Sequence, residues 1–156
     1  MAFIKANESP DFIIASGDIS NDGTKKSYAA YKKEIELFEK PVITILGNHD
    51  NDENFQTVFG TILPSVEKIT LSETWLMIAI DSTSKNKESG HITREQLLAL
   101  RKLIESNKNK SLLICLHHQP IKMGFWIDEV GLDNRDQFIE CIANQSNIKA
   151  ILWGHV

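Results

Sequence analysis

Short apolar runs that end abruptly in polar residues constrain the fold of this chain more than any other feature. They alternate with segments whose apolar residues recur every three or four positions, which is the spacing of an amphipathic helix. Strands that alternate with helices favour an α/β sheet. The expected strands are Asp11–Ser16, Val42–Leu46, two within Val66–Ile80 joined by a turn near Leu71–Thr74, Ser111–Leu116 and Ile148–Trp153.

Helices are expected between these strands. Thr93 and Gln96 form a capping-box pattern at the start of one of them. Met1–Pro10 has the pattern of a helix end that leads into the first strand. The other helices are expected at Thr24–Lys40, ended by Pro41, at Asn51–Gly60, at Thr93–Ser106 and at about Asn134–Asn144.

Composition limits the classes of function. The chain has 156 residues, 42% of them apolar, which suits one domain spanning residues 1–156. Its net charge is −4 with both signs interspersed, so no basic stripe predicts a nucleic-acid polymer as partner. No apolar run reaches the ~20 residues of a membrane span, and no signal-peptide core is visible. We expect a cytoplasmic domain without a membrane partner, in which Cys115 and Cys141 are buried thiols.

Polar residues follow four of the expected strands. Asp18 follows the first, Asn48-His49-Asp50 the second, His117-His118 the fifth and His155 the last. The carboxyl ends of strands in an α/β sheet meet at one crevice, where ligands bind. Carboxylate, amide and imidazole groups gathered there suit a divalent transition metal.

Each of these residues also has a structural interpretation. Asp18 after a glycine can be a turn residue, and Asn48-His49-Asp50 can cap the next helix. A single histidine after a strand can be a hydrogen-bonded structural group. The recurrence of such residues after four strands is what favours the metal interpretation.

The motifs that carry these residues resemble those of the calcineurin-like metallophosphoesterases. Gly17-Asp18, Gly47-Asn48-His49-Asp50, His117 and Gly154-His155 occur in the order of the family's motifs. The resemblance implies an αββα sandwich, and Gly-Asn-His-Asp behind an apolar strand is its most specific element.

A narrower resemblance is to the bacterial class III cyclic-AMP phosphodiesterases. It rests on Asp11–Gly23, the turn at Ser89-Gly90, His117-His118-Gln119-Pro120 and Trp126-Ile127-Asp128 with Leu132 and Asn134. Relatives often have proline where Gln119 stands, so the loop after His117 is expected to differ. For Trp126, stacking on a nucleobase and packing a loop against the core both stay open.

The family's roles carry over residue by residue. Asp18 would bridge two metals, and Asn48, His117 and His155 would complete the second metal's ligands. His49 would stabilise or protonate the leaving oxygen, with Asp50 orienting its ring, and Asn48 and His49 would contact the substrate. His118 is expected as an outer-sphere or rim group, although an exchange of roles with His117 stays open.

The resemblance implies hydrolysis of a small phosphodiester, a 3',5'-cyclic nucleotide such as cyclic AMP, by attack of metal-bound hydroxide. Two divalent ions of iron, manganese or zinc would serve the complete site. The alternative is a non-catalytic remnant of this fold that binds a ligand or partner. The sequence indicates no oligomeric state.

Two family motifs are incomplete. No Asp-x-His occurs, and the chain ends at Val156, where Gly-His-x-His requires one more histidine. We therefore expect a fold without its first strand and C-terminal part, and an incomplete metallophosphoesterase domain. At most one metal would be well ligated, and this chain would be inactive or weakly active.

Overall fold

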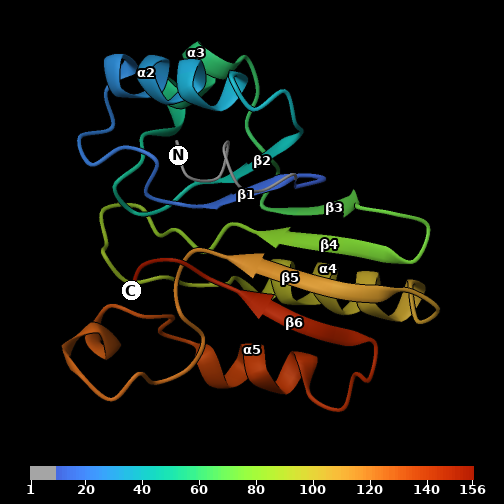
Figure 1. The fold of residues 1–156 in the computed structure, drawn as a ribbon. Coiled ribbons are helices and arrows are strands. Elements are labelled where there is room, and N and C mark those ends of the chain that lie inside the picture. Colours follow the sequence, from blue (N-terminus) through green and yellow to red (C-terminus); the bar gives the residue numbers. More distant parts are fainter. Residues whose placement is uncertain (1–9) are drawn as a thin grey trace.

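The elements of the fold follow the expected alternation of strands and helices. The structure, a computed structural model, describes residues 10–156, so the helix end expected before Pro10 lies outside the described residues. Figure 1 shows the arrangement. In chain order the elements are β1 (Ile13–Ser16), α2 (Lys25–Glu36), β2 (Val42–Ile45), α3 (Asp52–Phe59), β3 (Val66–Thr70), β4 (Trp75–Ile80), α4 (Arg94–Ser106), β5 (Ser111–Leu116), the 3-10 helix η1 (Trp126–Glu129), α5 (Arg135–Ile142) and β6 (Ile148–Leu152).

The strands form two sheets. β1 and β2 pair in parallel, and within residues 10–156 they form a sheet of their own. The second sheet has the order β3-β4-β5-β6, in which β3 is antiparallel to β4 and the other pairs are parallel. The carboxyl ends of β4, β5 and β6 therefore lie at one end of their sheet, at the left of Figure 1.

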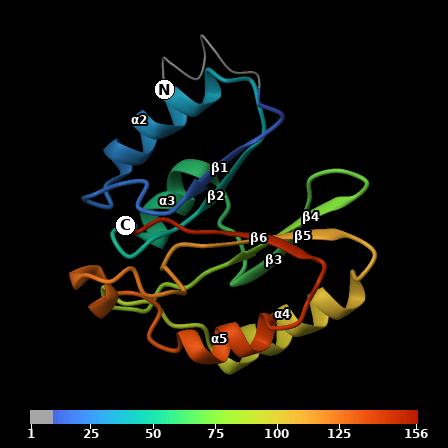
Figure 2. The same ribbon diagram turned by 60° about the horizontal axis from the view of Figure 1, so that its bottom comes forward.

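Three apolar clusters set the order of the layers. Alternate residues of β4 face opposite sides: Ile78 packs with α4 and α5, whereas Met77 packs toward β1 and β2. Tyr28, Leu46 and Phe55 form the third cluster, beneath α2 and α3. Figure 2 shows the resulting order of helices, sheet, sheet and helices. The chain is thus the α/β, αββα sandwich expected from the resemblance.

One helix is shorter than its sequence pattern suggested. The segment predicted to run from Thr24 to Lys40 is helical only at Lys25–Glu36, with Thr24 as its N-cap. Glu39 has a φ of 52°, which is incompatible with a right-handed helix. Pro41 also disfavours helical geometry at the residue before it. The other expected helices form, and the capping box of Thr93 with Gln96 is present.

Two expectations from composition concern the cysteines and membrane-spanning helices. Cys115 and Cys141 are both free and buried. Within residues 10–156, none of the helices has the length and apolar character that crossing a membrane requires.

Candidate metal centre

The first two strands end in glycines that bring their loops into close contact. A Cβ atom on Gly47 would lie 2.3 Å from Oδ1 of Asp18 and 2.7 Å from Cε1 of His117. Gly17, with a φ of 102°, adopts a backbone conformation that other residues rarely enter. The chain therefore turns sharply after β1, and only a residue without a side chain fits at the end of β2.

His117 is the central residue of the site. It directly follows β5, and its side chain is buried. Its Nδ1–H donates to the carbonyl oxygen of Ser16 over 2.8 Å. Because a carbonyl oxygen only accepts, Nδ1 carries the ring proton, and in the neutral ring Nε2 presents its lone pair. A hydrogen bond of this kind fixes the ring of a metal-binding histidine.

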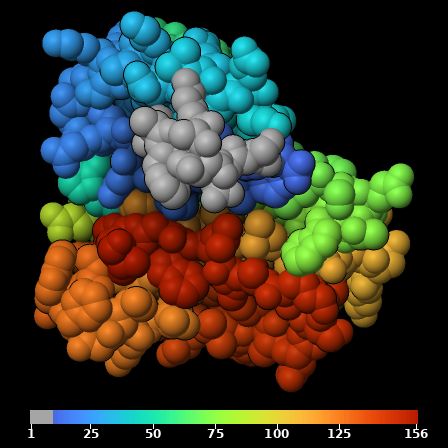
Figure 3. Space-filling model, viewed as in Figure 1, coloured from blue at the N-terminus to red at the C-terminus, as the bar shows by residue number. Residues whose placement is uncertain are grey.

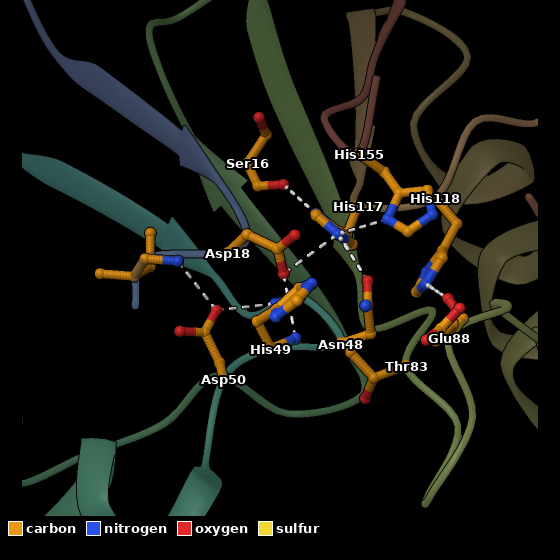
Figure 4. A network of polar contacts seen from close by, with 12 residues as sticks. Ser16, Asp18, Asn48, His49, Asp50, Thr83, Glu88, His117, His118 and His155 are labelled. Carbon is orange, nitrogen blue, oxygen red and sulfur yellow. Dashed lines mark hydrogen bonds and ion pairs between the residues drawn. The ribbon is translucent and has the colours of Figure 1, made fainter. Parts of the chain in front are cut away.

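Three of the predicted ligands surround Nε2 of His117 (Figure 4). The distances from Nε2 are 3.1 Å to Oδ1 of Asn48, 3.2 Å to Nδ1 of His155 and 3.4 Å to Oδ1 of Asp18. Metal–ligand bonds of about 2.1 Å would place neighbouring ligand atoms roughly 3.0–3.4 Å apart. The structure therefore brings all four predicted metal ligands together at separations that suit a divalent ion.

The chemistry of these donors supports the same conclusion. A carboxylate oxygen, an amide oxygen and two imidazole nitrogens are the ligands that iron, manganese and zinc accept. When the ring of His117 is neutral, the lone pair of its Nε2 faces Oδ1 of Asp18. Two acceptors at this distance need a proton or a cation between them. The residues present thus fit the metal that the sequence analysis predicted.

His155 reaches the site from the segment after β6. Its φ is 65°, an uncommon conformation for a residue with a side chain. The pKa of its ring is lowered, chiefly by burial and then by the neighbouring His117 ring. A neutral imidazole is the form that binds a metal.

His118 is buried, which rules out a position on the rim. Its Nε2–H donates to the carbonyl oxygen of Glu88 over 3.0 Å, so Nδ1 accepts from the hydroxyl of Ser82 over 2.9 Å. Burial, followed by the His117 ring, lowers its pKa to about 4. Ring nitrogens of His117, His118 and His155 lie within 4.8 Å of one another. Both nitrogens of His118 nevertheless have partners already, so His117 is the better ligand.

His49 and Asp50 occupy different environments. His49 is exposed beside Asp18 and Asn48 (Figure 4), and its backbone N–H donates to Oδ1 of Asp18 over 3.1 Å. The carboxylate of Asp50 instead accepts hydrogen bonds from backbone amides and a tyrosine hydroxyl. Within residues 10–156, the expected contact between Asp50 and the His49 ring is not among these hydrogen bonds. Asp50 holds the backbone of the loop rather than the ring.

A cleft opens beside these residues. Its volume is about 730 Å³, and residues 47–53 form one wall while residues 83–88 form the other. His49 lines it, together with Lys85 and Lys87 from the polar loop after β4. The cleft therefore gives a small ligand access to His49 and to Asn48, one of the four predicted metal ligands.

Trp126 does not pack a loop against the core, since 71% of its surface is exposed. It starts η1, which lies at the same end of the molecule as the carboxyl end of β6 in Figure 1. The surface of this orange segment is visible at the lower left of Figure 3. The neighbouring Ile127 is the residue that packs inward, and Gln119 donates to its carbonyl oxygen over 2.7 Å. Trp126 is therefore free to contact a ligand or solvent.

The sequence analysis missed three residues that support the site. They are Ser16, whose carbonyl orients His117, Ser82, which binds His118, and Tyr28, which binds Asp50. Ser82 follows β4 with only Asp81 between them, which is a strand-end signal of the kind used for the other residues. The contact of the Ser16 carbonyl oxygen could not be predicted, because every residue has a backbone carbonyl and the sequence does not show which one a side chain binds.

The fold and site define an α/β protein with a candidate metal centre at the ends of its strands. The chain belongs to the calcineurin-like phosphoesterase family, whose model matches residues 1–156. It is similar to the 3',5'-cyclic adenosine monophosphate phosphodiesterase CpdA of Pseudomonas aeruginosa, with 32% identity over 97% of this chain and 56% of the relative. It is also similar to a probable cyclic nucleotide phosphodiesterase of Colwellia psychrerythraea, with 35% identity over 96% of this chain and 57% of the relative.

A third relative carries a different name. The probable glycerophosphodiester phosphodiesterase GpdQ of Arcobacter nitrofigilis is 32% identical over 94% of this chain and 56% of the relative. The chain thus spans little more than half the length of the curated relatives that it matches. The names of these relatives agree on phosphodiesters but differ in the substrate.

Proposed function

We propose that this chain carries the metal-binding core of a phosphodiesterase that hydrolyses a small phosphodiester, with a 3',5'-cyclic nucleotide such as cyclic AMP as substrate. The observation that supports this most is the convergence of Asp18, Asn48 and His155 on Nε2 of His117. The names of the cyclic-nucleotide relatives supply the substrate class.

Asp18, Asn48, His117 and His155 would hold a divalent ion of iron, manganese or zinc. When bound, such an ion would polarise a phosphoryl oxygen and lower the pKa of a water molecule, which favours attack of that water on the phosphorus atom. Two ions are proposed for the complete protein, with Asp18 as the shared ligand. In the 156 residues of this chain we propose at most one well-ligated ion and weak or absent turnover.

We propose that His49 stabilises or protonates the leaving oxygen. It is exposed, lines the cleft and lies next to Asn48, so substrate entering the cleft would meet both side chains. A protonated imidazole in this place would give its proton to the departing alkoxide, a contribution typically worth ~10²–10⁴-fold in rate. Asp50 would act on His49 through the loop backbone that it binds.

A titration of the purified chain with Mn²⁺, followed by calorimetry, tests the proposal. We expect one ion per chain, and we expect bound Mn²⁺ to be required for binding of cyclic AMP. Trace hydrolysis of bis(p-nitrophenyl) phosphate should exceed that of p-nitrophenyl phosphate. A chain that binds neither Mn²⁺ nor any phosphodiester would overturn the proposal and favour the non-catalytic remnant. Robust Mn²⁺-dependent turnover would instead contradict the expected weakness of this chain.

A further inference from the structure

Tyr28 is a buried tyrosine whose hydroxyl contacts the loop that carries two of the proposed site residues. Its side chain has no exposed surface, and its ring packs edge-on against Phe55, with centroids 5.4 Å apart. The hydroxyl donates to Oδ1 of Asp50 over 3.0 Å and accepts from the backbone N–H of Asn51 over 2.7 Å. Both hydrogen-bonding capacities of the phenol are therefore used within one loop.

Asp50 extends this contact to a second loop. Its Oδ1 accepts from the backbone N–H of Ser20 over 3.0 Å, and its Oδ2 accepts from that of Ile19 over 3.1 Å. Oδ2 also accepts from the backbone N–H of Gly47 over 2.9 Å. One carboxylate thus joins the loop after β1 to the loop after β2, and Tyr28 holds this carboxylate from the side of α2.

The two loops are those that carry Asp18 and Asn48. Asp18 has a φ of 52°, a conformation that is sparsely populated and persists only where the surroundings hold it. The two residues after it are the ones whose N–H groups Asp50 binds. Asn48 lies between Gly47 and Asp50, which are hydrogen-bonded to each other. The carboxylate therefore fixes the backbone of both loops next to these two proposed ligands.

The phenol of Tyr28 is protonated, and therefore a donor, at neutral pH. Burial is the main cause that raises the pKa of Tyr28 above its ordinary value, and the nearby Asp50 charge adds to it. A neutral hydroxyl can donate to the carboxylate and accept from the amide at the same time.

From these contacts we propose that Tyr28 is a positioning residue for the metal centre, acting through Asp50 on the loops that carry Asp18 and Asn48. The inference rests on the proposed metal site. It predicts that a hydroxyl with no contact to any proposed ligand nevertheless sets the affinity for the ion. Groups that orient metal ligands typically change metal affinity by ~10–100-fold when they are removed.

Tyr28→Phe removes the hydroxyl and keeps the ring in its place against Phe55. The matched control is Tyr31→Phe on the same helix, because within residues 10–156 the hydroxyl of Tyr31 forms a hydrogen bond only with Oγ1 of Thr44, at 3.4 Å. We expect the Kd for Mn²⁺ to rise about tenfold in Tyr28→Phe and to stay within about twofold of wild type in Tyr31→Phe. The visible absorption of bound Co²⁺ should change in the first variant only.

Equal Mn²⁺ affinity and equal Co²⁺ spectra in wild type and Tyr28→Phe would overturn the inference. A Tyr28→Phe chain that fails to fold would do so too, since the hydroxyl would then serve the fold. If the wild-type chain binds no metal, the proposed function is refuted, but the role of Tyr28 is not yet decided. The NMR chemical shifts of the Asp18 and Asn48 backbone amides in the metal-free proteins then decide the role of Tyr28. Shifts that are the same in wild type and Tyr28→Phe refute this role. Shifts that change in Tyr28→Phe and not in Tyr31→Phe support it.

Discussion

His117 and Ser16 are 101 residues apart in the chain, yet the ring nitrogen Nδ1 of His117 lies 2.8 Å from the carbonyl oxygen of Ser16. The contact connects β5 of the larger sheet to β1 of the smaller one. It turns Nε2 toward Asp18 and Asn48 at the junction of the two sheets. The geometry of the proposed metal site therefore depends on how the two sheets pack, and not on one loop alone.

The first prediction concerns His117 itself. His117→Ala removes the nitrogen around which the other proposed ligands gather, so the Kd for Mn²⁺ should rise by at least about 100-fold. Isothermal titration calorimetry measures this directly. His91→Ala is the control, because His91 is exposed and pairs with Asp133 rather than with a proposed ligand. Similar Mn²⁺ affinity in the two variants would show that the ion binds elsewhere.

The second prediction concerns the close approach at Gly47. In Gly47→Ala the new methyl group would lie 2.3 Å from Oδ1 of Asp18 and 2.5 Å from its backbone nitrogen. We expect metal binding to be lost and the free energy of unfolding to fall by about 1–3 kcal/mol, the usual cost of overpacking. Urea denaturation and Mn²⁺ titration check the two effects.

Gly60→Ala is the control for this prediction. Gly60 ends α3 with a φ of 82°, and no atom lies within 4 Å of an added Cβ. Its substitution should therefore cost about 1 kcal/mol through backbone strain, with Mn²⁺ affinity unchanged. A Gly47→Ala variant that behaves like Gly60→Ala would mean that the loop relaxes freely.

The strand ends could be predicted from the sequence because apolar runs and the residues that follow them are local features. Asp18, Asn48, His117 and His155 were found in this way, and the order of the strands then brings them together. The hydrogen-bond partners of Asp50 and His118 could not be found in this way. Which group a buried side chain binds depends on segments distant in the chain, such as Tyr28 for Asp50.

The end of α2 illustrates a different limit. Apolar spacing continues to Phe38, but the helix ends at Glu36, and the φ of 52° at Glu39 is incompatible with a further right-handed turn. Periodicity reports which face is buried, whereas the last turn depends on local backbone geometry. Phe38 therefore keeps the spacing of the helix without belonging to it.

The third prediction tests the connection between the segment before α4 and the start of α5, where Asn134 is the N-cap. Asn134 accepts from the backbone N–H of Ile92 over 3.1 Å and donates to its carbonyl oxygen over 2.7 Å. Asn134→Ala should destabilise the chain by about 1–3 kcal/mol, since both backbone groups of Ile92 lose a partner. Amide exchange at Ile92 should accelerate. Asn107→Ala, which removes a contact to Leu103 within its own helix, should leave that exchange rate unchanged.

The last prediction concerns Trp126, which starts η1 and is 71% exposed. Because its ring makes little contact with the core, Trp126→Ala should change the free energy of unfolding by less than about 0.5 kcal/mol. Stacking on a base is typically worth ~1–3 kcal/mol. The Mn²⁺-loaded variant should therefore bind cyclic AMP about 5- to 150-fold more weakly, while its affinity for bis(p-nitrophenyl) phosphate stays the same.

Trp75→Ala separates stacking from a general effect of losing an indole. Trp75 begins β4, at the opposite end of this strand from the residues that line the cleft, and it is 39% exposed. Its substitution should leave the affinity for both ligands unchanged. Equal loss of affinity for both ligands in Trp126→Ala would mean that Trp126 shapes the cleft. Unchanged affinity for both ligands in Trp126→Ala would mean that the base of the substrate is bound elsewhere. The polar residues 83–88 of the cleft wall are then the alternative contact.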